Sequence, residues 1–110
     1  MVSKPSPAVH RTEELVNFLK RFGSAHKFNK WITDMESVLE GNMFAGHHIG
    51  KSKIPDYYRK RYGANTLYHY EHREGFGSCY MLVDFEGLGV CPLILDLKDH
   101  TEHARIFRHE

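Results

Sequence analysis

The sequence predicts a single α+β domain in which an N-terminal helical pair packs on one face of a small antiparallel β-meander. Residues 13–40 carry apolar side chains at helical spacing, and residues 67–97 carry three short apolar or alternating runs that turn residues separate. The 110 residues are enough for one domain with one modest core. Residues 1–11 contain two prolines and no apolar run, so we expect a flexible tail there and the domain at residues 12–110.

The first helix is expected to begin after Thr12, whose side chain can cap it, and two glutamates follow in the positive first turn. Gly23 ends this helix, and Ser24 is expected to cap the second. The second helix has the clearest apolar periodicity in the chain, at Phe28, Trp31, Ile32, Met35, Val38 and Leu39. The short loop between the helices predicts an antiparallel pair.

Residues 42–63 differ from the helical part, because Gly46, Gly50 and Pro55 prevent a long regular element. The segment is basic, and one further cation follows in a later turn. These side chains are candidates for RNA binding: Lys51, Lys53, Arg59, Lys60, Arg61 and Arg73. We expect Lys51 and Lys53 to alternate along an extended chain and to point to one side. The alternative is a solvated basic loop with tyrosines packed at its base.

Three strands are expected at residues 67–72, 76–84 and 90–97. The two-residue period of a strand puts Tyr68 and Tyr70 on one face, with Tyr80 beside them, either as an aromatic working surface or as core. Cys79 and Cys91 are expected to point to opposite faces and to remain free thiols, which is typical of a cytoplasmic protein.

The third strand ends in ionisable residues, which are Asp99, His100, Glu102 and His103. A rigid strand that brings such groups to an edge is a common way to position reactive side chains. Histidine titrates near neutral pH, so we interpret His100 as the acid–base candidate, with Asp99, Glu102 or His103 in support. The alternative is a solvated C-terminal turn that Asp99 caps.

Several classes of function are disfavoured. The net charge is +1, and no apolar run approaches the roughly 20 residues of a membrane span. No HxxxH motif falls on an expected helix, no CxxC pair occurs, and no glycine-rich phosphate loop is present. We therefore expect no metal and no cofactor. His100 and His103 would chelate a metal only if their segment is helical.

Several short motifs follow one another in a fixed order: Asn42-Met43-Phe44-Ala45-Gly46, Ile54-Pro55-Asp56-Tyr57-Tyr58, Tyr62-Gly63, Thr66-Leu67-Tyr68, Gly75-Phe76, Tyr80, Gly89-Val90-Cys91-Pro92, Leu95-Asp96 and Asp99-His100. In this order they resemble the RelE/ParE-like toxin superfamily, and within it small proteins of an archaeal type, over residues 12–107. The resemblance implies a RelE-like fold and adds Tyr80 to the candidate catalytic residues.

The resemblance also implies a function. The protein would be the toxin of a toxin–antitoxin system, a cytoplasmic and metal-free mRNA endoribonuclease that inhibits translation. Its partners would be mRNA, the ribosome and a cognate antitoxin. Where the family usually has an arginine beside the scissile phosphate, this chain has Gly77. One alternative is therefore a non-catalytic RelE-like protein that binds a protein or RNA through its sheet face, and another is a self-associating homodimer.

Overall fold

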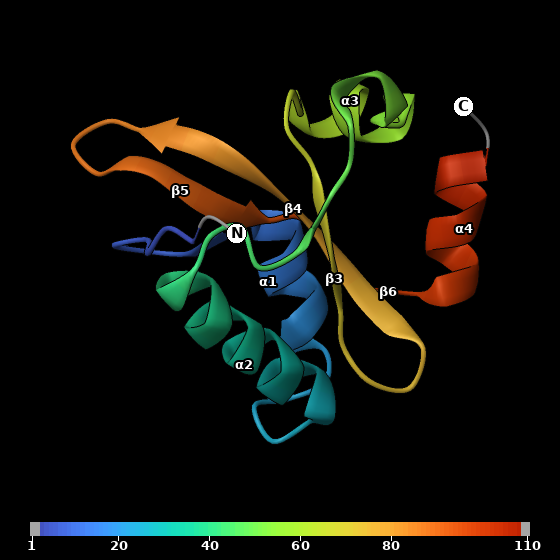
Figure 1. Cartoon of the computed structure of the whole chain (residues 1–110). Coiled ribbons are helices and arrows are strands. Elements are labelled where there is room, and N and C mark those ends of the chain that lie inside the picture. Colours follow the sequence, from blue (N-terminus) through green and yellow to red (C-terminus); the bar gives the residue numbers. More distant parts are fainter. Residues whose placement is uncertain (1–2, 109–110) are drawn as a thin grey trace.

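A computed structural model describes residues 3–108 as an α+β fold with a mixed, open sheet (Figure 1). The elements in chain order are β1 (His10–Arg11), α1 (Glu13–Lys20), α2 (Lys27–Gly41), β2 (His47–His48), the 3₁₀ helix η1 (Lys51–Lys53), α3 (Asp56–Tyr62), β3 (Tyr68–Glu71), β4 (Phe76–Phe85), β5 (Gly89–Ile94), β6 (Lys98–Asp99) and α4 (His100–Arg108). The strand order is β1-β5-β4-β3-β2, and β6 pairs with β4. The predicted α+β class is confirmed. None of the helices within residues 3–108 is long and apolar enough to cross a membrane.

The sheet is not the purely antiparallel meander that the sequence predicts. β1 pairs in parallel with β5, and His10 lies opposite Leu93. This strand belongs to the segment expected as a flexible tail. The same segment makes further backbone hydrogen bonds, from Ser6 N to Glu40 O (2.9 Å) and from Met43 N to Lys4 O (2.7 Å). A two-residue strand whose partner lies some 80 residues away leaves no periodic pattern in the sequence.

The helices α1 and α2 follow their local signals. Thr12 caps α1 as predicted, since its Oγ1 accepts a hydrogen bond of 3.1 Å from Leu15 N. The second helix starts later than expected, because His26 rather than Ser24 is its cap: Phe28 N donates to His26 Nδ1 at 3.1 Å. Gly23 adopts a φ of 79° between the helices, a conformation that glycine adopts without strain.

The first core lies between these helices and one face of the sheet. Its buried residues are Leu15, Leu19, Trp31, Ile32, Met35, Leu39, Tyr68, Tyr80, Ile94 and Leu97. The rings of Tyr68 and Tyr80 stack here, with centroids 5.0 Å apart. Of the two interpretations of these tyrosines, core is therefore the one that the structure supports.

The opposite sheet face is covered as well. A second cluster of buried residues, including Ile54, Tyr58 and Leu67, packs there on Cys79 and Met81 of β4. α3 and α4 lie over this face (Figure 1). The sequence did not indicate α3, because its seven residues are too few for a clear helical period.

The hairpin of β4 and β5 differs from its predicted register by one residue. Cys91 lies opposite Val83, four residues from Cys79 along the same strand. The two cysteines therefore share a face, contrary to the prediction, but lie about 13 Å apart along the strand direction. Both are free and buried, as predicted.

Candidate functional site

Four imidazole rings meet at one open pocket of about 380 Å³ between β2, β3 and α4, which we call the histidine pocket. Its lining consists of His47, Ile49, His69, Glu71, His100, His103, Ala104 and Phe107. Aliphatic and aromatic carbon supplies most of the remaining wall. A concave, mostly apolar site with a few convergent polar groups is the usual form of a binding or catalytic site.

The paired strands β2 and β3 and the helix α4 position these histidines. His47 and His69 are opposite each other in the antiparallel pair of β2 and β3. His100 and His103 lie on α4, three residues and so about one turn apart. Asp99 caps this helix, because its Oδ1 accepts a hydrogen bond of 2.8 Å from Glu102 N. Asp99 is therefore a cap, as the alternative interpretation expected. The segment that it caps is a helix and not a solvated turn.

His69 is the half-buried member of the group. Burial lowers the pKa of His69 below its ordinary value, and the neighbouring His103 and His100 lower it further against the opposing effect of Glu71. Its ring lies edge to face against His103, with centroids 5.1 Å apart. His69 is consequently neutral at pH 7 and able to accept a proton.

Gly77 makes room for this ring. A Cβ atom at position 77 would lie 2.7 Å from His69 Nε2 and 3.1 Å from the carbonyl oxygen of Tyr70. Such a distance is too short for any side chain, so a residue larger than glycine requires His69 to move. An imidazole from β3 therefore occupies the space beside Gly77 on β4.

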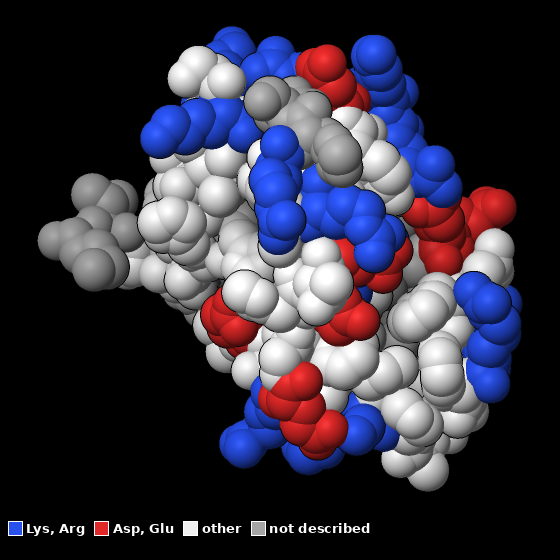
Figure 2. Space-filling model, turned by 90° about the vertical axis from the view of Figure 1, so that its right-hand side faces the viewer, with Lys and Arg blue, Asp and Glu red and all other residues white. Residues whose placement is uncertain are grey.

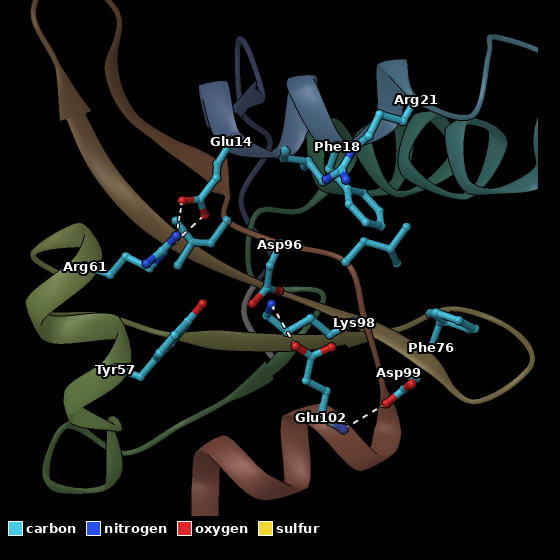
Figure 3. A pocket seen from close by; sticks show the side chains of 13 residues that line it. Glu14, Phe18, Arg21, Tyr57, Arg61, Phe76, Asp96, Lys98, Asp99 and Glu102 are labelled. Carbon is cyan, nitrogen blue, oxygen red and sulfur yellow. Dashed lines mark hydrogen bonds and ion pairs between the residues drawn. The ribbon is translucent and has the colours of Figure 1, made fainter.

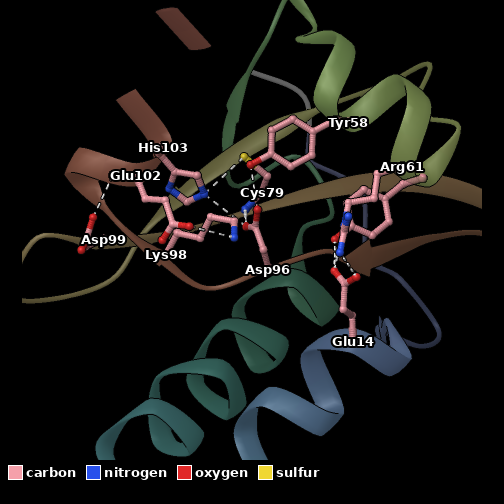
Figure 4. A network of polar contacts seen from close by, with 10 residues as sticks. Glu14, Tyr58, Arg61, Cys79, Asp96, Lys98, Asp99, Glu102 and His103 are labelled. Atoms are coloured by element: carbon pink, nitrogen blue, oxygen red, sulfur yellow. Dashed lines mark hydrogen bonds and ion pairs between the residues drawn. The ribbon is translucent and has the colours of Figure 1, made fainter. Parts of the chain in front are cut away.

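Beneath the pocket lies a buried polar network centred on Asp96 (Figure 4). Asp96 Oδ2 accepts a hydrogen bond of 2.7 Å from Tyr58 Oη, and Oδ1 accepts one of 2.9 Å from Cys79 N. His103 Nε2 lies 3.2 Å from Oδ1 of Asp96 and 4.0 Å from Sγ of Cys79. All four residues are buried. His103 Nδ1 has no hydrogen-bond partner among the described residues.

This network is not a cysteine–histidine–aspartate nucleophilic triad. In such a triad the two ring nitrogens of histidine face different partners, whereas Nε2 of His103 faces both the thiol and the carboxylate. Burial raises the pKa of the Cys79 thiol, and nearby Asp96 raises it further, so the reactive thiolate is disfavoured in the protein alone. The network orients His103 from below the pocket.

A second pocket, of about 330 Å³, lies on the other side of Asp96 between α1, α3 and the start of α4 (Figure 3). We call it the paired-charge pocket, because two ion pairs lie in its lining. Arg61 forms an ion pair with Glu14, and Lys98 lies 3.5 Å from Glu102. Phe18, Tyr57 and Phe76 line the apolar part. Arg21, Asp96 and Asp99 also line the pocket, so it combines two ion pairs with further charged groups.

The cations predicted to bind RNA are divided by the structure. Lys51 and Lys53 lie on η1 and not on an extended strand, so at three residues per turn they do not share a side. Arg59 donates to Ile54 O (3.0 Å) and Lys51 O (2.6 Å). The guanidinium of Arg61 is held by Glu14, as described above.

Lys51, Lys53 and Lys60 are exposed and form no ion pair among residues 3–108. Lys and Arg side chains gather at the top of the face in Figure 2, the level at which Figure 1 places α3 and the end of α4. Arg73 lies elsewhere, at a small pocket beside Trp31 and Asp34. None of the six predicted cations lines the histidine pocket, although Ile49, two residues before η1, does, and Glu71 lines both this pocket and that of Arg73.

The candidate catalytic residues are divided as well. His100 and His103 both line the histidine pocket, whereas Asp99 and Glu102 line the paired-charge pocket. Tyr80 is fully buried, and its hydroxyl donates to Met43 O (2.8 Å) and accepts from Gly46 N (2.9 Å). Tyr80 therefore has a structural role in the core and does not reach the histidine pocket.

Three residues that the structure adds are His47, His69 and Asp96. His69 carried a weak signal, since strand alternation placed it on the face opposite Tyr68. Asp96 carried a clearer one, because a carboxylate inside an apolar run must be buried with partners. His47 carried none, because only its pairing with His69 brings it to the pocket.

No protein-family model, no curated protein and no solved structure matches the chain. Inferences about its function therefore depend on the geometry of the histidine pocket and on the sequence pattern.

Proposed function

We propose that this protein is a metal-free endoribonuclease that cleaves mRNA in the cytoplasm, as the toxin of a toxin–antitoxin pair. The observation that carries the proposal is the convergence of His47, His69, His100 and His103 on one pocket. A RelE-like fold is part of the proposal, and the shared core of α1, α2 and the sheet supports it.

The chemistry requires a base and an acid on either side of the scissile phosphate. His69, neutral at pH 7, removes the proton of the ribose 2′-hydroxyl. The 2′-oxygen attacks phosphorus, the bond between phosphorus and the 5′-oxygen breaks, and exposed His100 donates a proton to the departing oxygen. The products are a 2′,3′-cyclic phosphate and a 5′-hydroxyl. His103 supports the pair from below.

Cations must also stabilise the charge that develops on the phosphate. The arginine that the RelE-like pattern places at position 77 is absent here, and the ring of His69 fills that space. Lys51, Lys53 and Lys60 are the exposed cations of the basic segment that form no ion pair within residues 3–108. They would hold the RNA backbone while the histidine pocket carries out the proton transfers.

The test is cleavage of a defined mRNA, alone in buffer containing EDTA and, in a separate reaction, during translation in buffer containing Mg²⁺. We expect wild-type protein to leave 2′,3′-cyclic phosphate ends, and His100→Ala and His69→Ala to reduce the rate by about 10²–10⁴-fold. His48→Ala is the matched control, since His48 is an exposed neighbour of His47 whose ring lies 5.1 Å from Tyr68, outside the pocket. The proposal fails if the wild type leaves both messages intact, or if His100→Ala cleaves as fast as His48→Ala.

A second candidate is a non-catalytic protein that binds RNA or a partner protein. The guanidinium groups of Arg59 and Arg61 are already bound to backbone carbonyls and to Glu14. This favours the second candidate, because only lysines of the basic segment remain to contact the phosphate. RNA binding that falls steeply with salt but produces no cleavage would support this candidate over the first.

A further inference from the structure

We propose that Cys79, Asp96 and His103 bind one Zn²⁺ ion beneath the histidine pocket. These three residues offer a thiol sulfur, a carboxylate oxygen and an imidazole nitrogen that all lie within 4.8 Å of one another, and all three are buried. No spacing motif indicates the site, because its ligands come from β4, from the segment after β5 and from α4. The site shares His103 with the histidine pocket, but His69 and His100, which carry the proposed proton transfers, are not among its ligands.

The distances match those of a zinc centre. With bonds of about 2.0–2.3 Å at tetrahedral angles, nitrogen and oxygen ligands lie about 3.3 Å apart, and sulfur and nitrogen ligands about 3.6 Å apart. His103 Nε2 lies 3.2 Å from Asp96 Oδ1 and 4.0 Å from Cys79 Sγ. The first distance needs no adjustment, and the second needs only a small rotation of the thiol or the ring.

Charge and ligand type favour zinc among the common cations. A thiolate, a carboxylate and Zn²⁺ sum to zero, so the occupied site carries no net charge into the interior. Sulfur and imidazole ligands suit zinc and disfavour magnesium and calcium, which prefer oxygen. The thiol loses its proton to solvent as the zinc–sulfur bond forms.

The surroundings provide orientation and access. Tyr58 Oη and Cys79 N already hold the carboxylate of Asp96, as outer hydrogen bonds hold metal-binding carboxylates. Asp96 lines the paired-charge pocket and His103 lines the histidine pocket, so the cluster lies between two openings (Figures 3 and 4). A water molecule from one of them can complete four-fold coordination.

The experiment measures metal content and a spectroscopic signature on the full chain. After dialysis against micromolar Zn²⁺, we expect about one zinc per chain in the wild type and in Cys91→Ser, the other buried cysteine. Cys79→Ser and His103→Gln should retain less than a tenth of that amount. Substitution by Co²⁺ should give the wild type a sulfur-to-cobalt charge-transfer absorption.

The surface histidines of the histidine pocket are the competing explanation for any bound zinc. If Cys79→Ser retains as much zinc as Cys91→Ser, or if the wild-type Co²⁺ spectrum lacks the sulfur band, the inference is wrong. The Co²⁺ spectrum decides the matter even where a substitution prevents folding. Neither readout depends on RNA cleavage, so the two proposals fail separately.

Discussion

The hydroxyl group of Tyr58 gives the sharpest test of the buried network. In Tyr58→Phe, Asp96 Oδ2 loses its hydrogen bond of 2.7 Å, while the ring volume remains. Tyr58 is fully buried and Asp96 is only 6% exposed, so water does not readily replace the lost donor. A hydrogen bond to a charged group contributes about 1.5–3 kcal/mol, and we expect the free energy of unfolding to fall by about 2 kcal/mol.

Urea unfolding at pH 7 in the presence of EDTA measures this loss without any contribution from metal. In a thermal scan the same change corresponds to a decrease in Tm of about 8–16 °C for a domain of this size. Tyr57→Phe is the matched control, because the Tyr57 hydroxyl makes no hydrogen bond within residues 3–108 and its loss should cost less than about 0.5 kcal/mol. If the two variants are equally stable, the hydroxyl does not support the carboxylate and the network has been misinterpreted.

Three further outcomes are expected. Gly77→Ala should lower the free energy of unfolding by about 1–3 kcal/mol, since its Cβ meets His69, whereas Gly50→Ala, with nothing within 4 Å, should change it little; equal thermal stability would contradict this. Burial, aided by His69, lowers the pKa of His72 from 6.5 to about 4. As the pH falls between these values, His72 takes up a proton in the unfolded chain but not in the folded one, so the free energy of unfolding should decline there. Urea unfolding across that range should show a steeper decline for wild type than for His72→Gln, and parallel curves would refute the assignment. Lys53→Ala should reduce the salt dependence of RNA binding by about 0.7 in log–log slope, whereas Arg73→Ala, beside Trp31 and Asp34, should not; the reverse pattern would place the RNA beside Arg73.

The parts of the fold that the sequence predicted are those with local signals. Thr12 caps α1 because its hydroxyl accepts a hydrogen bond from the first turn of that helix. This contact does not depend on what the helix packs against. The apolar stripe from Phe28 to Leu39 is also a local signal, because it lies within the helix α2 that it predicts. β1 and α3 were not predicted, because two and seven residues are too short to establish a period. Their conformation is selected by distant partners, such as Leu93 opposite His10.

The candidate site was predicted in part for a similar reason. His100 and His103 share a pocket because one helical turn relates them. Lys51 and Lys53 were expected to share a side, but the 3₁₀ conformation of η1 rotates them apart. The contact between His69 and Gly77 depends on the register of β3 against β4, which no single segment encodes.

The order of elements along the chain affects the nascent protein. α1 and α2 are synthesised before the strands that complete their core, and Ile94 is the last strand residue of that cluster. At about 5–20 residues per second, the 53 residues from Asn42 to Ile94 take about 3–11 s to add. During that interval the aromatic side chains of Phe18, Phe28 and Trp31 have no sheet to cover them. The emerging helical pair therefore exposes apolar surface until the sheet has formed.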